Sequence, residues 1–329
     1  TYGTSNVDKF VPRQVRIGQN ESNTKLLTNI KYVAAGANSS AAIDQDGLLY
    51  VWGNNDNGQL GVDGKIVAYP TLVEALKDNP ATPNADETIL VSAVELSESH
   101  TIIIDALTKR AYTWGKNDHN QLGYQQSILN NGKPMTSPST ENYAKEAHLV
   151  TRDKGDLNFL EVASGKNHSV GIVIPASEAE TATQGTVYAW GDNTHGQLGL
   201  GDETEVATPK KLAIANVRQI SVGEDHTLFL QMNGTVYATG NYEHNKLGIY
   251  NLSGDLRIPT KVPSFLGASV VAVSAGTNHG LALYYTTNAA SFGDNSYGQL
   301  GNGNLLETTA IQTVEASGIF DISAGYNHS

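Results

Sequence analysis

The sequence predicts an all-β fold, a β-propeller made of four-stranded antiparallel blades. Two observations lead to this fold class. Two short motifs alternate along the whole chain, and the segments between them have strand-like rather than helical periodicity. The composition agrees, because 33 of the 329 residues are glycine and only 16% are charged. This composition suits many short strands joined by tight turns.

The first motif reads AWGDNTHGQLG at 189–199 and is repeated along the chain. Clear copies occur at 51–61 and 113–123, weaker copies at 239–248 and 292–301, and a degenerate start at 2–6. Its anchoring glycines are 50, 62, 76, 49 and 53 residues apart, so the basic unit is about 50 residues long, with insertions in the second and third intervals. All three tryptophans of the chain fill one slot of this motif: Trp52, Trp114 and Trp190.

The second motif reads VASGKNHS at 162–169 and alternates with the first. Its other copies lie at 33–40, 94–101, 220–227, 273–280 and 322–329. One slot holds Ser39 in the first copy and a histidine in the rest: His100, His168, His226, His279 and His328. One histidine per unit does not converge on a metal ion unless all of them face the axis. We therefore interpret these histidines as structural, each fastening its own blade through hydrogen bonds to the backbone.

Within one unit, the apolar segments are predicted to be short strands. TVYAW (186–190) and LLYVW (48–52) are rich in β-branched and aromatic residues, and the DG at 46–47 and the NG at 233–234 indicate hairpin turns. A unit of about four such strands buries both faces only by stacking on copies of itself. Radial stacking gives a propeller, and a left-handed coil of the same units is the alternative.

The alternating W-G-x-N-x-x-G-Q-L-G and A-G-x-x-H-S motifs resemble the regulator of chromosome condensation (RCC1-like) repeat family over the whole chain. The resemblance implies a propeller, usually of seven blades. Because six copies of each motif are present, we expect seven blades if the chain continues beyond one or both ends, and six blades otherwise. We expect residues 1–329 to form a single propeller domain, monomeric within a longer chain.

Composition also limits the partners. The net charge of −12 opposes binding to nucleic acid or to anionic membranes and favours basic partners. The chain has no cysteine, which excludes disulfides and thiolate chemistry, and it has no apolar run long enough for membrane insertion. Low lysine and arginine content with abundant asparagine, threonine and glycine favours an extracellular or bacterial cell-surface location, with the cytoplasm as the alternative.

The segments that look like ligand-binding motifs are better explained as structural parts of the repeat. GQLGLG (196–201) lacks the spacing, the following helix and the lysine of a phosphate loop, and NNDNG (54–58) lacks the spacing of a calcium loop. The tryptophans are interpreted as packing between blades rather than as a ligand platform. No Ser/His/Asp set or carboxylate pair departs from the repeat, so we predict no enzyme activity, no cofactor and no metal.

The departures from the repeat indicate a binding face. The pair of residues before each G/N-Q/K-L-G varies, and we predict that all five pairs lie on one rim: Asp56/Asn57, Asp118/His119, Thr194/His195, Glu243/His244 and Ser296/Tyr297. Long loops at 75–91, 124–158 and 175–184 either contribute to binding or are tolerated surface.

We therefore predict a non-catalytic binding or scaffold module that recognises a protein or a surface ligand through one propeller face. The resemblance implies an alternative, guanine nucleotide exchange on a Ran-like small GTPase, which is the activity of the founding family member. A further alternative is an enzyme inhibitor, because a bacterial β-lactamase inhibitor is built on similar repeats.

Overall fold

The structure is a computed structural model that describes residues 14–17, 25–76, 88–124, 143–152, 156–178, 181–265, 269–306, 308–314, 316 and 318–329. The chain divides into two compact units: unit 1 is Thr1–Asp118 with Gln126–Val150, and unit 2 is His119–Gln125 with Thr151–Ser329. The predicted long loops at 75–91, 124–158 and 175–184 lie partly outside the described residues.

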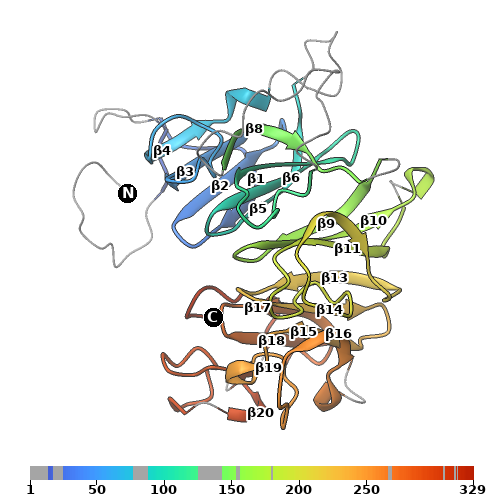
Figure 1. The fold of residues 1–329 in the computed structure, drawn as a ribbon. Coiled ribbons are helices and arrows are strands. Elements are labelled where there is room, and N and C mark those ends of the chain that lie inside the picture. Colours follow the sequence, from blue (N-terminus) through green and yellow to red (C-terminus); the bar gives the residue numbers. More distant parts are fainter. Residues whose placement is uncertain are drawn as a thin grey trace. The chain divides into compact units, whose positions relative to one another are not determined.

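Unit 1 contains two four-stranded antiparallel sheets, which we call blades 1 and 2 (Figure 1). Blade 1 consists of β1 (Ile30–Ala35), β2 (Ser39–Asp44), β3 (Leu49–Asn54) and β4 (Ile66–Leu72), followed by the short 3-10 helix η1 (Glu74–Leu76). Blade 2 consists of β5 (Val91–Leu96), β6 (His100–Asp105), β7 (Ala111–Lys116) and β8 (Tyr143–Leu149).

Unit 2 contains blades 3, 4 and 5, which have the same strand order (Figure 1). Blade 3 consists of β9 (Asn158–Ser164), β10 (His168–Ile174), β11 (Thr186–Gly191) and β12 (Val206–Lys211), with η2 (Ala176–Glu178) after β10. Blade 4 consists of β13 (Val217–Val222), β14 (His226–Gln231), β15 (Val236–Gly240) and β16 (Leu256–Lys261), with η3 (Glu243–Asn245) after β15 and η4 (Pro263–Phe265) after β16. Blade 5 consists of β17 (Val270–Ala275), β18 (His279–Tyr284), β19 (Ala289–Gly293) and β20 (Thr308–Thr313).

Each blade is a meander in which every strand pairs with the next one along the chain. The predicted hairpin turns at 46–47 and 233–234 connect β2 to β3 and β14 to β15, and Gly47 and Gly234 adopt φ values of 85° and 79° that the turns require. The third strand therefore ends at the opposite end of the blade from this hairpin. It leads into the first motif, which we call the tight loop.

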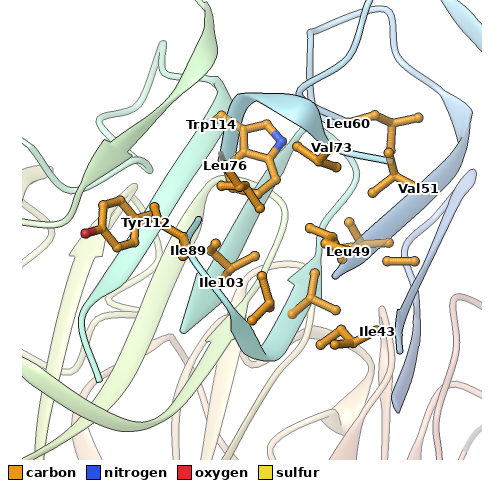
Figure 2. Close-up of a cluster of buried hydrophobic side chains, with 14 of the residues drawn as sticks. Ile43, Leu49, Val51, Leu60, Val73, Leu76, Ile89, Ile103, Tyr112 and Trp114 are labelled. Carbon is orange, nitrogen blue, oxygen red and sulfur yellow. The ribbon is translucent and has the colours of Figure 1, made fainter. Parts of the chain in front are cut away.

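Within each unit, the core lies between the faces of neighbouring blades. Figure 2 shows the cluster in unit 1, where Leu49 and Val51 of β3 face Ile103 of β6 and Trp114 of β7. The middle strands are buried on both faces, as in β6, where all six residues are buried. Such strands read as continuous apolar runs rather than alternating ones, because water contacts neither face.

The described residues form five blades, not the six or seven that the repeat count predicts. The degenerate first motif at 2–6 lies outside the described residues. The last copy of the second motif, 322–329, is described, but it pairs with no strand of a sixth blade among the described residues. It lies instead against blade 5, where the Ser329 hydroxyl donates to the backbone carbonyl of Gln299 at 2.8 Å.

Candidate binding rim

The tight loops of blades 1, 3 and 5 are each closed by two of their own side chains. In the loop at 193–199, Asn193 Oδ1 accepts the Leu198 backbone N–H at 3.0 Å, and Gln197 Oε1 accepts the His195 backbone N–H at 2.8 Å. The same two bonds recur in blades 1 and 5, where the pairs are Asn55 with Leu60, Gln59 with Asn57, Asn295 with Leu300 and Gln299 with Tyr297. The repeated asparagine and glutamine therefore hold the loop backbone, so the residue types of the two positions between them can differ among the blades.

The five predicted pairs occupy this variable position. We call these ten residues the loop rim. The first member is exposed in every blade: Asp56, Asp118, Thr194, Glu243 and Ser296. The second member is half-buried or exposed: Asn57, His119, His195, His244 and Tyr297. The first members are exposed at equivalent positions of the five blades and comprise four residue types, as a binding face on a constant frame requires.

In unit 2, two second members reach the next blade instead of pointing only to solvent. His195 Nδ1 lies 2.8 Å from Asp255 Oδ2, and Asp255 immediately precedes β16 of blade 4. His119 Nδ1 lies 3.4 Å from Glu205 Oε2, and Glu205 immediately precedes β12 of blade 3. The loop rim thus contains two contacts of the same kind, each joining a tight loop to the start of a fourth strand.

The tryptophan slot lies between blades. Trp114 Nε1 donates to the Gln59 carbonyl at 2.9 Å, and Trp190 Nε1 donates to the Gln121 carbonyl at 2.9 Å. Trp114 and Trp190 are fully buried, whereas Trp52 is half-buried. A Cβ at Gly123 would collide with the Trp190 indole, so the motif's final glycine makes room for the ring.

The histidine slot forms a hydrogen-bond relay between blades in unit 2. His168 Nε2 lies 3.2 Å from Thr227 Oγ1, and the Thr227 hydroxyl donates to the Gln197 carbonyl at 2.9 Å. Because a hydroxyl has one hydrogen, the His168 ring carries its proton on Nε2 and donates it. These contacts differ from the expected bonds to the histidine's own blade, since the partner hydroxyl belongs to the next one.

The relay recurs at His279, whose Nε2 lies 2.9 Å from Ser329 Oγ. His100 is also buried, and its Nδ1 lies 2.7 Å from Ser97 Oγ. The last histidine of the series, His328, is exposed.

Burial keeps the relay histidines neutral. Loss of solvation lowers the pKa of His168 to about 4 and that of His279 to about 4. For His226, loss of solvation and then the nearby Lys246 cation lower the pKa to about 3.

Comparison with known proteins places the chain in a family. The sequence model of the RCC1-like domain matches residues 2–329. The chain belongs to the RCC1-like domain family.

Curated relatives of this RCC1-like chain include the ultraviolet-B receptor UVR8 of Arabidopsis thaliana, 26% identical over 304 residues. That alignment covers 90% of this chain and 61% of the receptor. The probable E3 ubiquitin-protein ligase HERC3 of Homo sapiens is 30% identical over 343 residues, which cover 87% of this chain and 29% of the ligase. The chain therefore spans about three-fifths or less of these two relatives.

Two solved structures share the fold. Prp20p of Saccharomyces cerevisiae has a TM-score of 0.56 at 19% identity, covering 90% of this chain and 80% of Prp20p. Human WBSCR16 has a TM-score of 0.57 at 18% identity, covering 95% of this chain and 92% of that protein. At these identities the likeness concerns the fold alone.

Blade 1 also has a surface hollow, away from the loop rim. It has a volume of about 570 Å³ and lies along β4 in unit 1, with a lining that includes Val62, Ile66, Tyr69 and Leu72. Its lining holds two carboxylates, Asp63 and Glu74, and no histidine, lysine or arginine. Among the described residues, no group of three or more histidine, aspartate or glutamate side chains is placed to hold a metal ion, and no helix is long and apolar enough to span a membrane.

Sequence reasoning missed two features of the rim. The asparagine and glutamine that close the tight loop were visible as repeated motif letters, and their repetition was the signal. The acidic partners Glu205 and Asp255 share a place before the fourth strand of their blades, but neither belongs to a repeated motif. Their pairing depends on how one blade meets the next, which a single sequence does not reveal.

Proposed function

We propose that this RCC1-like chain is a non-catalytic binding module that recognises a protein partner through the loop rim. One observation carries the proposal: an asparagine and a glutamine close the tight loops of blades 1, 3 and 5, while the first members of the rim pairs are exposed in all five blades and comprise four residue types. A constant frame with variable exposed positions is how repeat proteins present a binding surface.

The charge of the chain favours a basic segment as the partner. The net charge is −12, and a field of this sign attracts cationic groups. Prp20p has described binding properties to Gsp1p and histones, and yeast RCC1 (Prp20) has been solved bound to Kap60. Protein recognition by a related propeller therefore supports the proposal, although exchange activity on a GTPase is not assigned to this chain.

The proposal is tested by comparing the two ends of the blades. A rim variant carries Thr194→Ala, Glu243→Ala and Ser296→Ala, which shorten exposed side chains and leave the loop-closing residues intact. A control variant carries Asp46→Ala and Thr286→Ala, which are exposed at the opposite, hairpin ends of their blades. Both variants should melt near the wild-type temperature, because surface substitutions usually change stability by less than about 0.5 kcal/mol.

Proteins captured by the wild type and identified by mass spectrometry are then titrated against both variants by calorimetry. We expect the rim variant to lose at least about tenfold in affinity for them, which corresponds to about 1.4 kcal/mol. The control variant should bind as the wild type does. Partners that bind all three proteins equally well would contradict recognition through the loop rim.

A further inference from the structure

In blade 3, one side of the tight loop is covered by the fourth strand of the next blade. A Cβ at Gly196 would lie 2.8 Å from Arg257 Cα, and a Cβ at Gly199 would lie 3.1 Å from Pro259 Cδ, both in β16. The Gly201 backbone N–H donates to the Arg257 carbonyl at 2.8 Å. Three glycines of the tight loop therefore form a surface on which an extended strand lies directly.

The tight loop of blade 5 has the same backbone surface, which we call the glycine face. Gly298, Gly301 and Gly303 stand in the positions of the three glycines of blade 3, and their φ values are 78°, 59° and 78°. Among the described residues, the atoms nearest to a Cβ at Gly298 or Gly301 belong to blade 5 itself, and the Gly303 N–H has no hydrogen-bond acceptor. Gly199 is buried in blade 3, whereas the equivalent Gly301 is exposed.

The C-terminal segment already lies at this junction in the manner of a first strand. The Ala324 backbone N–H donates to Ser274 Oγ at 2.9 Å, just as the Ala275 N–H donates to Ser221 Oγ at 2.9 Å between blades 4 and 5. Residues 322–329 thus repeat the contact that the first strand of one blade makes with the blade before it. The glycine face is therefore continuous with an interface that the fold already uses between blades.

The side chains beside the glycine face are apolar, whereas those in blade 3 are charged. Glu203, three residues before β12, pairs with Arg257 at 2.7 Å. Leu305 has the same place before β20; it lies against the glycine face and is 66% exposed, and Tyr297 is 72% exposed. Exposed apolar side chains that gather at one place indicate an interaction site. A strand bound here needs an apolar residue where β16 has arginine, because a cation would lose water without gaining a carboxylate.

We infer that the glycine face of blade 5 binds an extended segment of a partner protein that has an apolar residue two positions before a proline. The template is β16, whose Arg257 and Pro259 are two positions apart and lie against two glycines of blade 3. In the partner, an apolar side chain replaces the arginine and packs on Leu305, and the carbonyl of that residue accepts the Gly303 N–H. The inference goes beyond the proposed function, because it concerns this face and not the exposed first members of the loop rim.

Two capped peptides test the inference by NMR titration of the whole chain. One has the sequence GDLRIPTK of residues 254–261, and the other, GDLFIPTK, carries Arg257→Phe. We expect the phenylalanine peptide to bind at least about tenfold more tightly, because its ring is buried against Leu305. The Gly303 amide should exchange with solvent more slowly in this complex, since it then donates to a peptide carbonyl.

A substitution at the leucine tests which residue of the peptide is read. Leu305→Glu places the carboxylate of blade 3 beside the glycine face, so the arginine peptide should now bind more tightly than the phenylalanine peptide. Leu107→Glu, at an exposed leucine in the hairpin of blade 2, is the control and should keep the preference of the wild type. Melting curves establish that both variants are folded.

Three results would overturn the inference. The first is equal affinity of the wild type for both peptides, or no response of the Gly303 amide. The second is a wild type that binds neither peptide; a lower melting temperature of Leu305→Glu would then show that a segment of this chain covers the glycine face. The third is a dimer in sedimentation that dissociates in Leu305→Glu, which would assign the face to a second copy. None of these results involves the first members of the loop rim, so the proposed function is tested separately.

Discussion

Two junctions in unit 2 are built from the same repeat but held together differently. At the junction of blades 3 and 4, Thr227 bridges the His168 ring and the Gln197 carbonyl. At the junction of blades 4 and 5, Gly280 stands in the place of Thr227, so no side-chain hydroxyl is available to His226. Within the part of the chain that the structure describes, both buried ring nitrogens of His226 are without a hydrogen-bond partner.

A buried ion pair and aromatic packing hold the second junction. Lys246 replaces the glutamine of the tight loop, and its Nζ lies 2.7 Å from Asp225 Oδ1 and 2.9 Å from Asn278 Oδ1 of blade 5. Phe292 fills the tryptophan slot, where a Cβ at Gly280 would collide with its ring. The propeller therefore keeps its blade contacts when a charge pair replaces the neutral relay.

Acid should weaken both junctions and give the largest effect. The pKa values of about 4 for His168 and His279 and about 3 for His226 lie below the value of an unfolded histidine, so the unfolded chain binds more protons between about pH 6.5 and pH 4. The contribution of these histidines to the free energy of unfolding is therefore fully present above this pH range and is lost as the pH falls through it. Each ring should cost about 2 kcal/mol at pH 5 relative to pH 7.

Urea unfolding at pH 7, 6 and 5 measures this dependence. His226→Gln should reduce the slope of this dependence, because one buried ring with a lowered pKa is removed. A free energy of unfolding that stays constant from pH 7 to pH 5 would show that these rings are not held neutral.

Lys246→Met should have the next largest effect, confined to the second junction. Removing the cation leaves the mostly buried Asp225 carboxylate without its ion-pair partner, which costs about 3 kcal/mol in the free energy of unfolding. The matched change at the first junction, Gln197→Met, removes neutral hydrogen bonds and should cost only about 1 kcal/mol. Denaturant unfolding at pH 7 compares them, and equal losses would argue against a distinct role for the charge pair.

Thr227→Val should have the smallest effect of the three, confined to the first junction. The methyl group keeps the volume of the hydroxyl but leaves His168 Nε2 and the Gln197 carbonyl unpaired, at a cost of about 2 kcal/mol. Thermal unfolding measures the loss. Thr286→Val, at an exposed hairpin position, serves as the control and should be nearly neutral.

The hairpins and the buried positions within one repeat could be predicted from the sequence, because a residue type that recurs at one position of the repeat indicates the same local structure in each copy. The hairpin at 233–234 and the burial of Trp114 and Trp190 follow from patterns within one unit. The relay and the Asp255 contact could not be predicted, since they join residues of neighbouring blades about 60 positions apart. The described residues form five blades rather than the six or seven predicted, because the repeated letters at 322–329 do not by themselves supply four paired strands.

Because the tight loop is held by its own hydrogen bonds, a blade can accept an inserted peptide between this loop and the fourth strand. In blade 3 the closing bonds end at Leu198, and the chain does not enter its next strand until Val206. Blade 2 carries a natural insertion in the corresponding interval, which begins after Gly123. A peptide epitope placed in this interval of blade 3 would be displayed beside the loop rim, and the scaffold would keep its register.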